Sequence, residues 1–334
     1  MNAPLPQGVL RPEVAQARLL KLQVLAIRLV AEGIHAFELG DPDGAELPTV
    51  TAGAHVDVHL PGGGLVRSYS LAGDPSDNTC WTLGVLREPN GRGGSRAMHE
   101  SVRVGELLTV GAPRNAFAMV PGAAHTVLLA GGIGITPIKA MVHALTAQGA
   151  SFELHYCARS PRNAAFAQAL RALVPPHQLH FHFDNGVPGQ GLDIAGLLCQ
   201  QPDGAHLYYC GPEGFMKACA TASAHWSPSS VHCEHFKAPE PAPKTAPDGG
   251  FEVRLLRRGI TIPVLPEQSI VRAIELAGHR VPTSCLAGLC GSCKVDYLEG
   301  DVEHNDYILT DEEKTRCLTL CVSRARSPLL VLDF

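Results

Sequence analysis

The sequence lacks any apolar run long enough to cross a membrane, because a charged residue, Gly or Pro interrupts each long run well before about 18 residues. Its start, MNAPLPQGVLRPE, lacks the basic-then-apolar order of a signal peptide, so we expect a cytoplasmic protein. A surplus of positive charge is also missing, since 32 acidic residues outnumber 27 basic residues. Binding to nucleic acid or to an anionic membrane therefore has no electrostatic basis.

The eleven cysteines lack the even count that a disulfide framework prefers. In a reducing compartment, such cysteines serve either as small core residues or as metal ligands. Five of them lie in the last part of the chain, whereas the other six are scattered through predicted strands and helices. Spacing therefore separates the two uses.

The length of 334 residues allows two or three domains at about 150 residues each. The clearest boundary is APEPAPKTAPDGG, a Pro-rich segment typical of a solvated tether. We predict domains at 1–122, 123–237 and 251–334, with residues 238–250 as the linker.

Each predicted domain has its own pattern of elements. Residues 1–122 contain short strands separated by Gly-rich turns, which indicates an antiparallel β-barrel. In residues 123–237, apolar strands alternate with helices, which predicts an α/β fold with a parallel sheet. Residues 251–334 combine a strand pair, a short helix and a cysteine-rich loop, which indicates a small α+β domain.

The cysteine-rich loop has the spacing of a plant-type 2Fe–2S site. Cys285, Cys290 and Cys293 form C-x(4)-C-x(2)-C, and Cys321 follows after twenty-seven intervening residues. Zinc is the main alternative, but zinc ribbons favour two C-x(2)-C pairs and the chain has one. Cys317 is a rival fourth ligand; we favour Cys321 because it begins the predicted strand CVSRA.

Two segments of the barrel suggest a mononucleotide site. In RSYSL, 67–71, an arginine can neutralise a phosphate, a tyrosine can lie along a flat ring and a serine can bond the ring edge. An ordinary exposed strand explains that segment equally well. In GRGGS, 91–95, a Gly-rich turn opens a helix and offers backbone N–H groups to a phosphate, the alternative being a helix capped by Ser95.

Two further glycine motifs follow strands of the predicted parallel sheet. AGGIGITP, 130–137, allows a pyrophosphate to approach the start of a helix, although it is not the G-x-G-x-x-G fingerprint. A tight strand–helix turn is the alternative explanation. YYCGP, 208–212, places a second glycine at the same edge of the sheet, where open α/β sheets bind ligands.

These motifs, followed by CEHF and CLAGLCGSC…CVSRARSPLLVLDF, occur in the order of the phthalate dioxygenase reductase family. The chain resembles that family over nearly its whole length. The resemblance implies an FMN-binding barrel, an NAD-binding domain and a C-terminal plant-type ferredoxin domain. It also implies electron transfer from NADH to a partner oxygenase that carries a Rieske centre and non-haem iron.

The resemblance implies roles for individual residues. By this resemblance, FMN is bound by Arg67, Ser68, Tyr69, Ser70, Val85, Leu86, Arg92, Gly93, Gly94, Ser95, Thr136 and Phe236. Phe236 covers the flavin ring. The nicotinamide nucleotide falls to Gly131, Gly132, Gly134, Pro137, Cys210, Gly211 and Pro212, with Arg159 and Ser160 beside the adenine ribose. No segment is left for the adenosine half of FAD, so FMN is expected.

The predicted chemistry is a conversion between two-electron and one-electron carriers. A nicotinamide gives a hydride, a 2Fe–2S cluster takes single electrons, and flavin links the two. No side chain needs to act as acid, base or nucleophile. The alternatives are an NAD(P)H-dependent electron transferase for another acceptor and a non-catalytic redox sensor.

Nucleotide preference depends on the residue after strand 152–158. An acidic residue there would bond the ribose 2′-hydroxyl and repel a 2′-phosphate, but this chain has Ser160 flanked by Arg159 and Arg162. We therefore expect a partial preference for NADH, with some use of NADPH.

The segment from Asp296 to Glu313 contains eight acids and no Lys or Arg. It forms either a docking patch for the oxygenase or a solvated face.

Overall fold

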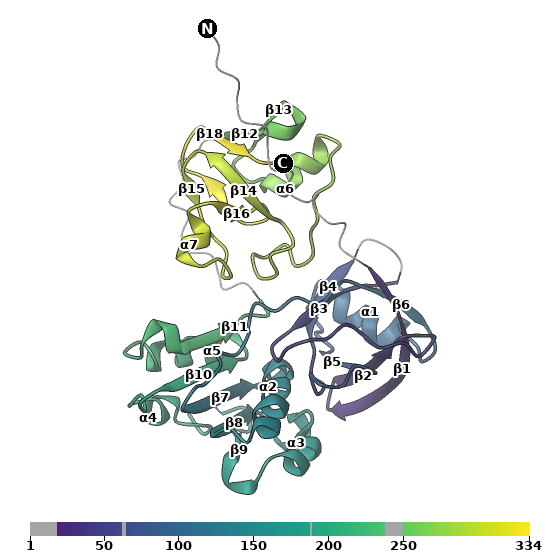
Figure 1. The fold of residues 1–334 in the computed structure, drawn as a ribbon, viewed down its shortest axis with the longest axis vertical. Helices are drawn as coiled ribbons and strands as arrows, with labels where there is room; N and C mark the ends of the chain where they lie inside the picture. Colours follow the sequence, from purple (N-terminus) through teal and green to yellow (C-terminus); the bar gives the residue numbers. More distant parts are fainter. Residues whose placement is uncertain (1–18, 62–64, 188, 238–249) are drawn as a thin grey trace.

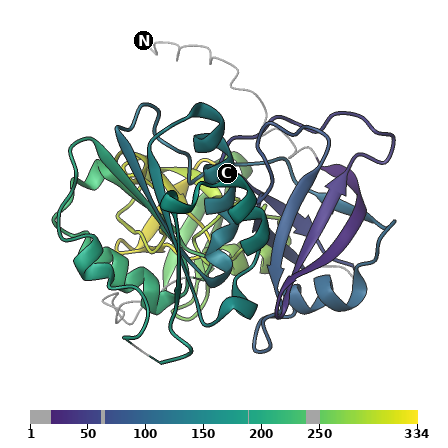
Figure 2. The same cartoon turned by 90° about the horizontal axis from the view of Figure 1, so that it is seen from below.

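The computed structural model describes residues 19–61, 65–187, 189–237 and 250–334. The predicted linker, apart from Gly250, lies outside the described residues. Three main sheets organise the chain: the barrel and the parallel sheet lie side by side, and the cysteine-rich domain sits across both (Figures 1 and 2). No helix in the described ranges has the length and apolar character to cross a membrane.

The first sheet confirms the predicted antiparallel barrel. Its strand order is β4-β3-β6-β1-β2-β5, and an isolated bridge between Leu71 and Leu83 joins its two edges. Alternate residues such as Val56, Val58 and Leu83 point into its core because successive strand side chains face opposite ways. The elements are β1 (Leu20–Ala31), β2 (Ile34–Gly40), β3 (His55–His59), β4 (Val66–Ser70), β5 (Trp81–Leu86), α1 (Gly94–Ser101) and β6 (Leu107–Val110).

The second sheet is wholly parallel, in the order β11-β10-β7-β8-β9, as the alternation of strands and helices predicts. Its strands are β7 (His125–Gly131), β8 (Phe152–Ala158), β9 (Leu179–Phe183), β10 (Ala205–Cys210) and β11 (Val231–Glu234). Its helices are α2 (Ile135–Gln148), α3 (Ala167–Leu173), α4 (Ile194–Leu197) and α5 (Glu213–Ala222), with short 3-10 turns at Gly132–Gly134, Pro161–Asn163, Pro176–Gln178 and Pro228–Ser230. Both faces carry apolar clusters, so the sheet is buried on two sides over most of its width.

The third sheet has the order β13-β12-β18-β14-β16, with a separate β15–β17 pair. Its elements are β12 (Phe251–Leu255), the turn Leu256–Arg258, β13 (Ile260–Val264), α6 (Ile270–Leu276), β14 (Lys294–Glu299), β15 (Val302–Glu303), α7 (Asp311–Lys314), β16 (Cys317–Thr319), β17 (Arg324–Ala325) and β18 (Leu329–Leu332). Ser269 caps α6 and Thr310 caps α7, each by accepting a backbone N–H bond. The cysteine-rich loop lies between α6 and β14, and it faces the barrel.

Candidate functional site

The cysteine-rich loop folds around its own sulfur atoms. The backbone N–H groups of Ala287 and Leu289 donate to Cys285 Sγ at 3.4 Å each, and that of Cys285 donates to Cys290 Sγ at 3.5 Å. Such N–H donors stabilise negative charge on sulfur. The loop is therefore built to hold thiolates.

Gly288 lets this loop approach the segment that carries the fourth predicted ligand. Its φ is +70°, and a Cβ there would lie 2.8 Å from Val322 Cγ2 and 3.0 Å from Asp306 Cα. A side chain would therefore push the loop away from Cys321, which precedes Val322. The glycine is required both by its backbone conformation and by the space available.

The four predicted ligands come together as two pairs. A hydrogen bond from Cys285 lowers the pKa of Cys290 to about 5, and one from Cys321 lowers the pKa of Cys293. Cys290, Cys293 and Cys321 are buried, and Cys285 is half-buried. The same bonds raise the pKa of Cys285 and of Cys321. Four neighbouring cysteines, two of them with a lowered pKa, together with the backbone donors to sulfur, fit a 2Fe–2S cluster.

One detail of the predicted cluster loop is wrong. Cys321 does not begin a strand: it lies in the turn after β16, and β17 begins at Arg324. The rival Cys317 lies on β16, where its thiol donates to the carbonyl of Glu313 at 3.1 Å. The turn, rather than a strand, brings Cys321 to the loop.

The predicted phosphate end of the flavin site is formed by β4 and the start of α1. Arg67 Nη2 donates to the carbonyl of Arg92 at 2.9 Å, and a Cβ on Gly94 would lie 2.5 Å from Arg67 Cγ. Ser95 does not cap α1: its hydroxyl accepts the N–H of Glu88 at 3.0 Å, and no side chain caps the helix at Gly93. The first backbone N–H groups of α1 thus have no side-chain cap, and Arg67 lies beside them. Free N–H groups next to a positive charge are what an anion site needs.

The other predicted flavin residues differ in exposure. Burial raises the pKa of Tyr69, so its phenol stays neutral. The Val85 side chain is in the barrel core and its carbonyl is bonded to His99 Nε2 at 2.8 Å, which leaves Leu86 as the more accessible of that pair. Phe236 follows β11 and is 40% exposed.

Thr136 connects the barrel to the nucleotide-binding sheet. It is buried in the first turn of α2, its hydroxyl donates to the carbonyl of Ile133 at 3.0 Å, and a Cβ on Gly84 of β5 would lie 2.6 Å from its methyl group. Pro137 follows in the same turn, where a missing N–H costs nothing, and it is also buried. Thr136 therefore packs against β5 of the barrel, the domain in which the resemblance predicts the flavin.

The two glycine motifs of the parallel sheet meet. A Cβ on Gly134 would collide with the carbonyl of Cys210, and one on Gly131 would lie 2.9 Å from Pro212 Cδ. Gly132 and Gly211 lie between them in the same two loops. The carboxyl ends of β7 and β10 are thus in close contact, at the edge where such sheets bind nucleotides.

Arg159 and Ser160 directly follow β8 at that same edge. Arg159 is exposed, and the hydroxyl of Ser160 donates to Asn163 Oδ1 at 2.8 Å. The residues are placed as predicted relative to the strand end, although a local bond engages Ser160.

Glu234 and His55 belong to the site, and the sequence analysis did not single them out. Glu234 pairs across β10–β11 with Cys210, and Ser70 donates to its carboxyl at 3.3 Å. Burial raises the pKa of Glu234 to about 8, and burial followed by the Arg114 charge lowers the pKa of His55 to about 4. Both groups are therefore neutral at pH 7, with His55 Nδ1 3.9 Å from Glu234 Oε1. The resemblance in CEHF, residues 233–236, pointed to Phe236, and Glu234 lies in the same segment, two residues earlier.

A second buried carboxylate joins the barrel to the cysteine-rich domain. Asp57 on β3 accepts hydrogen bonds of 2.7 Å from Ser68, Ser284 and Arg114, and a longer one of 3.4 Å from Ser292. Asp57 and Ser284 are each 6% exposed. We call this group of five residues the Asp57 junction.

The Asp57 junction fixes the cluster loop directly beside the predicted flavin site. Ser284 precedes the ligand Cys285, whose carbonyl accepts a hydrogen bond of 3.1 Å from Arg92 Nη2. Arg92 in turn holds Arg67 through its own carbonyl. One chain of contacts therefore runs from the phosphate end of the barrel to the cysteine loop.

Comparisons with known proteins agree with this geometry. Residues 253–326 match the 2Fe-2S iron-sulfur cluster binding domain, and residues 128–221 match the oxidoreductase NAD-binding domain. The chain is 48% identical to the tert-butanol monooxygenase / tert-amyl alcohol desaturase reductase subunit of Aquincola tertiaricarbonis, covering 94% of this chain and 96% of that one. It is 45% identical to a vanillate O-demethylase oxidoreductase of a Pseudomonas strain, over 94% of this chain and all of that one.

Solved structures give the same result. The structure of phthalate dioxygenase reductase is 36% identical, with a TM-score of 0.71 over 95% of this chain and 98% of that one. An intact type IV self-sufficient cytochrome P450 monooxygenase is 35% identical, with a TM-score of 0.85 over 97% of this chain and 43% of that one. Because full-length relatives share both the fold and more than a third of the residues, this chain belongs to the phthalate dioxygenase reductase family and is an NADH-dependent oxidoreductase with a 2Fe–2S cluster.

Proposed function

We propose that this protein is the reductase component of a Rieske non-haem iron aromatic oxygenase system, passing electrons from NADH to the oxygenase. The Asp57 junction carries this proposal, because it fixes the cluster loop against the barrel that would hold FMN. FMN supplies the conversion of a hydride pair into single electrons that the cluster can take. The domains would be 1–122 for FMN, 123–237 for NADH and 251–334 for the cluster, with 238–250 as linker.

The proposed roles of the residues follow from their contacts. Arg67 and the N–H groups of Gly93, Gly94 and Ser95 would hold the FMN phosphate. Tyr69, Ser70, Leu86 and Thr136 would orient the ring, with Ser68, Val85 and Arg92 supporting them and Phe236 covering it. The nucleotide would lie on Gly131, Gly132, Gly134, Cys210, Gly211 and Pro212, and the cluster on Cys285, Cys290, Cys293 and Cys321.

The neutral carboxyl of Glu234 supports binding of a nicotinamide beside the flavin. A carboxylate at that place would carry an uncompensated buried charge, whereas a carboxylic acid can donate a hydrogen bond. Its bond with Ser70 and its pairing with Cys210 place it where the barrel meets the nucleotide edge. We propose that Glu234 and Ser70 position the nicotinamide ring without taking part in hydride transfer.

Electron transfer to a purified Rieske-type oxygenase tests the proposal. Protein reduced with NADH in the absence of oxygen is mixed with the oxidised oxygenase, and the spectrum of the Rieske centre is followed. We expect its full reduction, with NADH consumed in proportion. Rapid NADH oxidation by dyes without any reduction of Rieske-type oxygenases would contradict the proposed partner but not the reductase.

A second acceptor class is favoured by one specific observation. The reductase part of a self-sufficient cytochrome P450 monooxygenase superposes on this chain with a TM-score of 0.85. An NADH-dependent electron transferase serving a haem protein is therefore the alternative. Parallel assays with a Rieske-type oxygenase and a cytochrome P450 separate the two, since the proposal expects faster reduction of the Rieske centre.

We further propose that the acidic segment from Asp296 to Glu313 contributes to the docking of the partner. Several of its acids already have partners: Lys294 pairs with Glu313 at 3.0 Å, and Asp306 is 8% exposed. The docking charge would come from the exposed acids that remain, such as Glu299 and Glu312. Reduction of the oxygenase should then slow with rising ionic strength, while NADH oxidation by the flavin does not.

A cytoplasmic location, where thiols stay reduced and NADH is available, fits this proposed role.

A further inference from the structure

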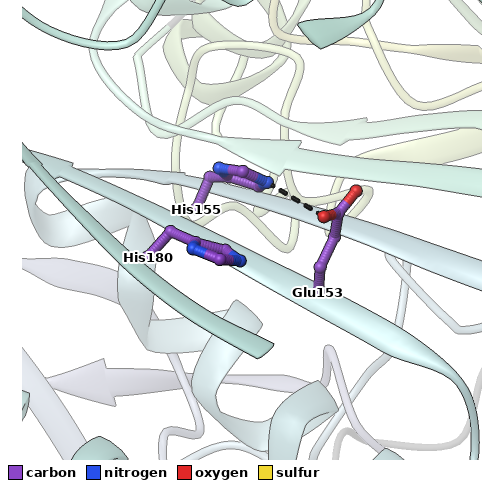
Figure 3. A group of neighbouring side chains, drawn as sticks. All are labelled: Glu153, His155 and His180. Carbon is purple, nitrogen blue, oxygen red and sulfur yellow. Dashed lines mark ion pairs between the residues drawn. The ribbon is translucent and has the colours of Figure 1, made fainter. Parts of the chain in front are cut away.

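A cluster of histidines lies on the nucleotide-binding sheet, apart from both junctions with the barrel and the ferredoxin domain. Glu153 and His155 are two residues apart on β8, so their side chains share one face of the sheet. His180 on β9 is the direct cross-strand partner of His155. Figure 3 shows the three side chains gathered on these two neighbouring strands.

The distances within this cluster suit a shared ligand. His155 Nε2 lies 3.3 Å from Glu153 Oε2, and the rings of His155 and His180 stack with centroids 4.7 Å apart. One ligand atom from each of the three residues lies within 4.8 Å of the other two. Two imidazole nitrogens and one carboxylate oxygen therefore lie close together on one face of the sheet.

His155 is the anchor of the cluster. It is 7% exposed, and its Nε2 makes no hydrogen bond with any group in the part of the chain that the structure describes. A buried polar atom without a hydrogen bond is costly, so a buried imidazole nitrogen directed at a carboxylate calls for a ligand between them.

Neighbouring side chains contact two of the three residues, His155 and Glu153. His155 Nδ1 lies 3.1 Å from His182 Nε2, so the other ring nitrogen of His155, Nε2, is the one available to bind a metal ion. His125 Nε2 lies 3.7 Å from Glu153 Oε1, on the side of the carboxyl away from His155 Nε2. A second ring or carboxylate that holds each ligand in place is typical of metal sites.

We propose that Glu153, His155 and His180 bind one divalent transition-metal ion of the zinc class. Two imidazoles and a carboxylate are ligands that zinc accepts, with water completing the coordination, whereas calcium and magnesium prefer oxygen donors alone. The ion links strand β8 to its neighbour β9, the edge strand of the sheet. It thereby stabilises the open edge of the sheet that carries the nucleotide.

The same sheet offers a matched control. His206 and His232, on β10 and β11, stack with centroids 5.3 Å apart and with Nδ1 and Nε2 at 3.0 Å. Within the described residues, the Glu153 cluster is the one group of three such ligands, so the His206–His232 pair has rings but no third donor. Loss of His206 should leave zinc binding unchanged.

The test uses tag-free holoprotein with its flavin and cluster in place, titrated calorimetrically with zinc chloride, while zinc and iron contents are measured together. We expect the protein to bind one zinc ion per chain more than the untitrated protein contains, and its melting temperature to rise. His180→Ala and Glu153→Gln should each abolish the rise and weaken binding by roughly tenfold or more, and His182→Ala should weaken it by about tenfold. His206→Ala should bind as the wild type does.

Zinc K-edge absorption identifies the ligands, and it distinguishes this site from the cysteines. Nitrogen and oxygen neighbours at about 2.0–2.1 Å support the proposal. A sulfur shell at about 2.3 Å, with loss of iron, would place the zinc at the cysteine site and overturn it. Unchanged zinc binding in both His180→Ala and Glu153→Gln, or no binding by the wild type, would also overturn it.

Discussion

Two carboxyl groups, Asp57 buried and Glu234 half-buried, lie one at each junction of the barrel and have opposite protonation. Burial would raise the pKa of Asp57, but the Arg114 charge and the hydroxyls of Ser68 and Ser284 outweigh it and lower that pKa. Glu234 has one hydroxyl donor, from Ser70 at 3.3 Å, and burial raises its pKa to about 8. The number of donors, rather than depth alone, decides which carboxyl is ionised.

This difference corresponds to two different tasks. The ionised Asp57 connects two domains through charge-assisted hydrogen bonds, which are strong and directional. The neutral Glu234 leaves the nucleotide side without a fixed negative charge, where an anionic dinucleotide has to bind. The barrel therefore presents a fixed contact to the cluster and a neutral surface to the nucleotide.

The largest expected effect is loss of the cluster, the group that lies beyond the Asp57 junction. Cys290→Ala should lose the cluster, because that thiol is buried within the group of four and has the lowered pKa. Hydride transfer from NADH to the flavin should continue, since no nucleotide contact changes. Iron content and single-turnover flavin bleaching measure the two effects, and stoichiometric iron in the variant would disprove the ligand assignment.

Asp57→Asn should weaken the barrel–ferredoxin junction by about 2 kcal/mol, because it leaves Arg114 partly buried without its anion. The sign of its pH dependence follows from the lowered pKa: the stabilisation by Asp57 is present above its ordinary pKa of 3.8 and is lost as pH falls through the lower folded value. The difference in melting temperature between wild type and variant should therefore be large at pH 7 and shrink in strong acid.

Ser269→Ala is a suitable control for that measurement, because it removes a helix cap in the cysteine-rich domain without touching the barrel or Asp57. A stability difference for Asp57→Asn that stays the same down to strong acid would contradict an ionised Asp57.

Glu234→Gln should show the opposite pH dependence. The pKa of Glu234 is about 8 in the folded protein against an ordinary value of 4.5. Its contribution to the free energy of unfolding is therefore fully present below pH 4.5 and is lost as pH rises through 8. The variant cannot ionise, so it should match the wild type near pH 5 and exceed it by roughly 2 kcal/mol or more at pH 9. A constant difference between pH 5 and pH 9, by thermal unfolding of FMN-loaded protein, would show that Glu234 is not buried as a neutral acid.

The smallest expected effect concerns the choice of nucleotide. Ser160→Asp should reduce kcat/KM with NADPH by about tenfold, because a carboxylate repels the 2′-phosphate, and should leave NADH nearly unchanged. Arg171→Ala, on helix α3, serves as a charge control that lies away from the strand end. A wild-type enzyme that strongly prefers NADPH would contradict the expected NADH preference, and an unchanged ratio in the variant would place Ser160 away from the ribose.

Local sequence was enough to predict the three sheets and the cysteine loop. Alternation along β3 and the strand–helix rhythm after residue 123 depend on short-range patterns, and so does C-x(4)-C-x(2)-C. The contacts between domains were not predictable in this way, because Asp57 and Ser284 are far apart in sequence and meet across a domain boundary. Nothing in the pattern of β3 distinguishes Asp57 from an outward-facing polar residue.

The missed residues share this dependence on register. Glu234 became a site residue because β11 pairs with β10 and sets it beside Cys210. The segment FELHYCA shows Glu153 and His155 on one face, but their partner His180 is defined only by the parallel pairing of β8 with β9. The position of Cys321 differed from expectation because a turn, which has no hydrophobic periodicity, brings it to the loop.

The central claim is that electrons pass from the flavin to the cluster within one chain, across the Asp57 junction. Its most direct test is anaerobic stopped-flow mixing with NADH, following the flavin and cluster absorbance separately over a range of protein concentrations. We predict that flavin bleaching is followed by cluster reduction at a rate independent of protein concentration, and that Asp57→Asn slows this second phase alone. A second phase whose rate rises in proportion to protein concentration would mean that electrons move between chains, and would contradict the account.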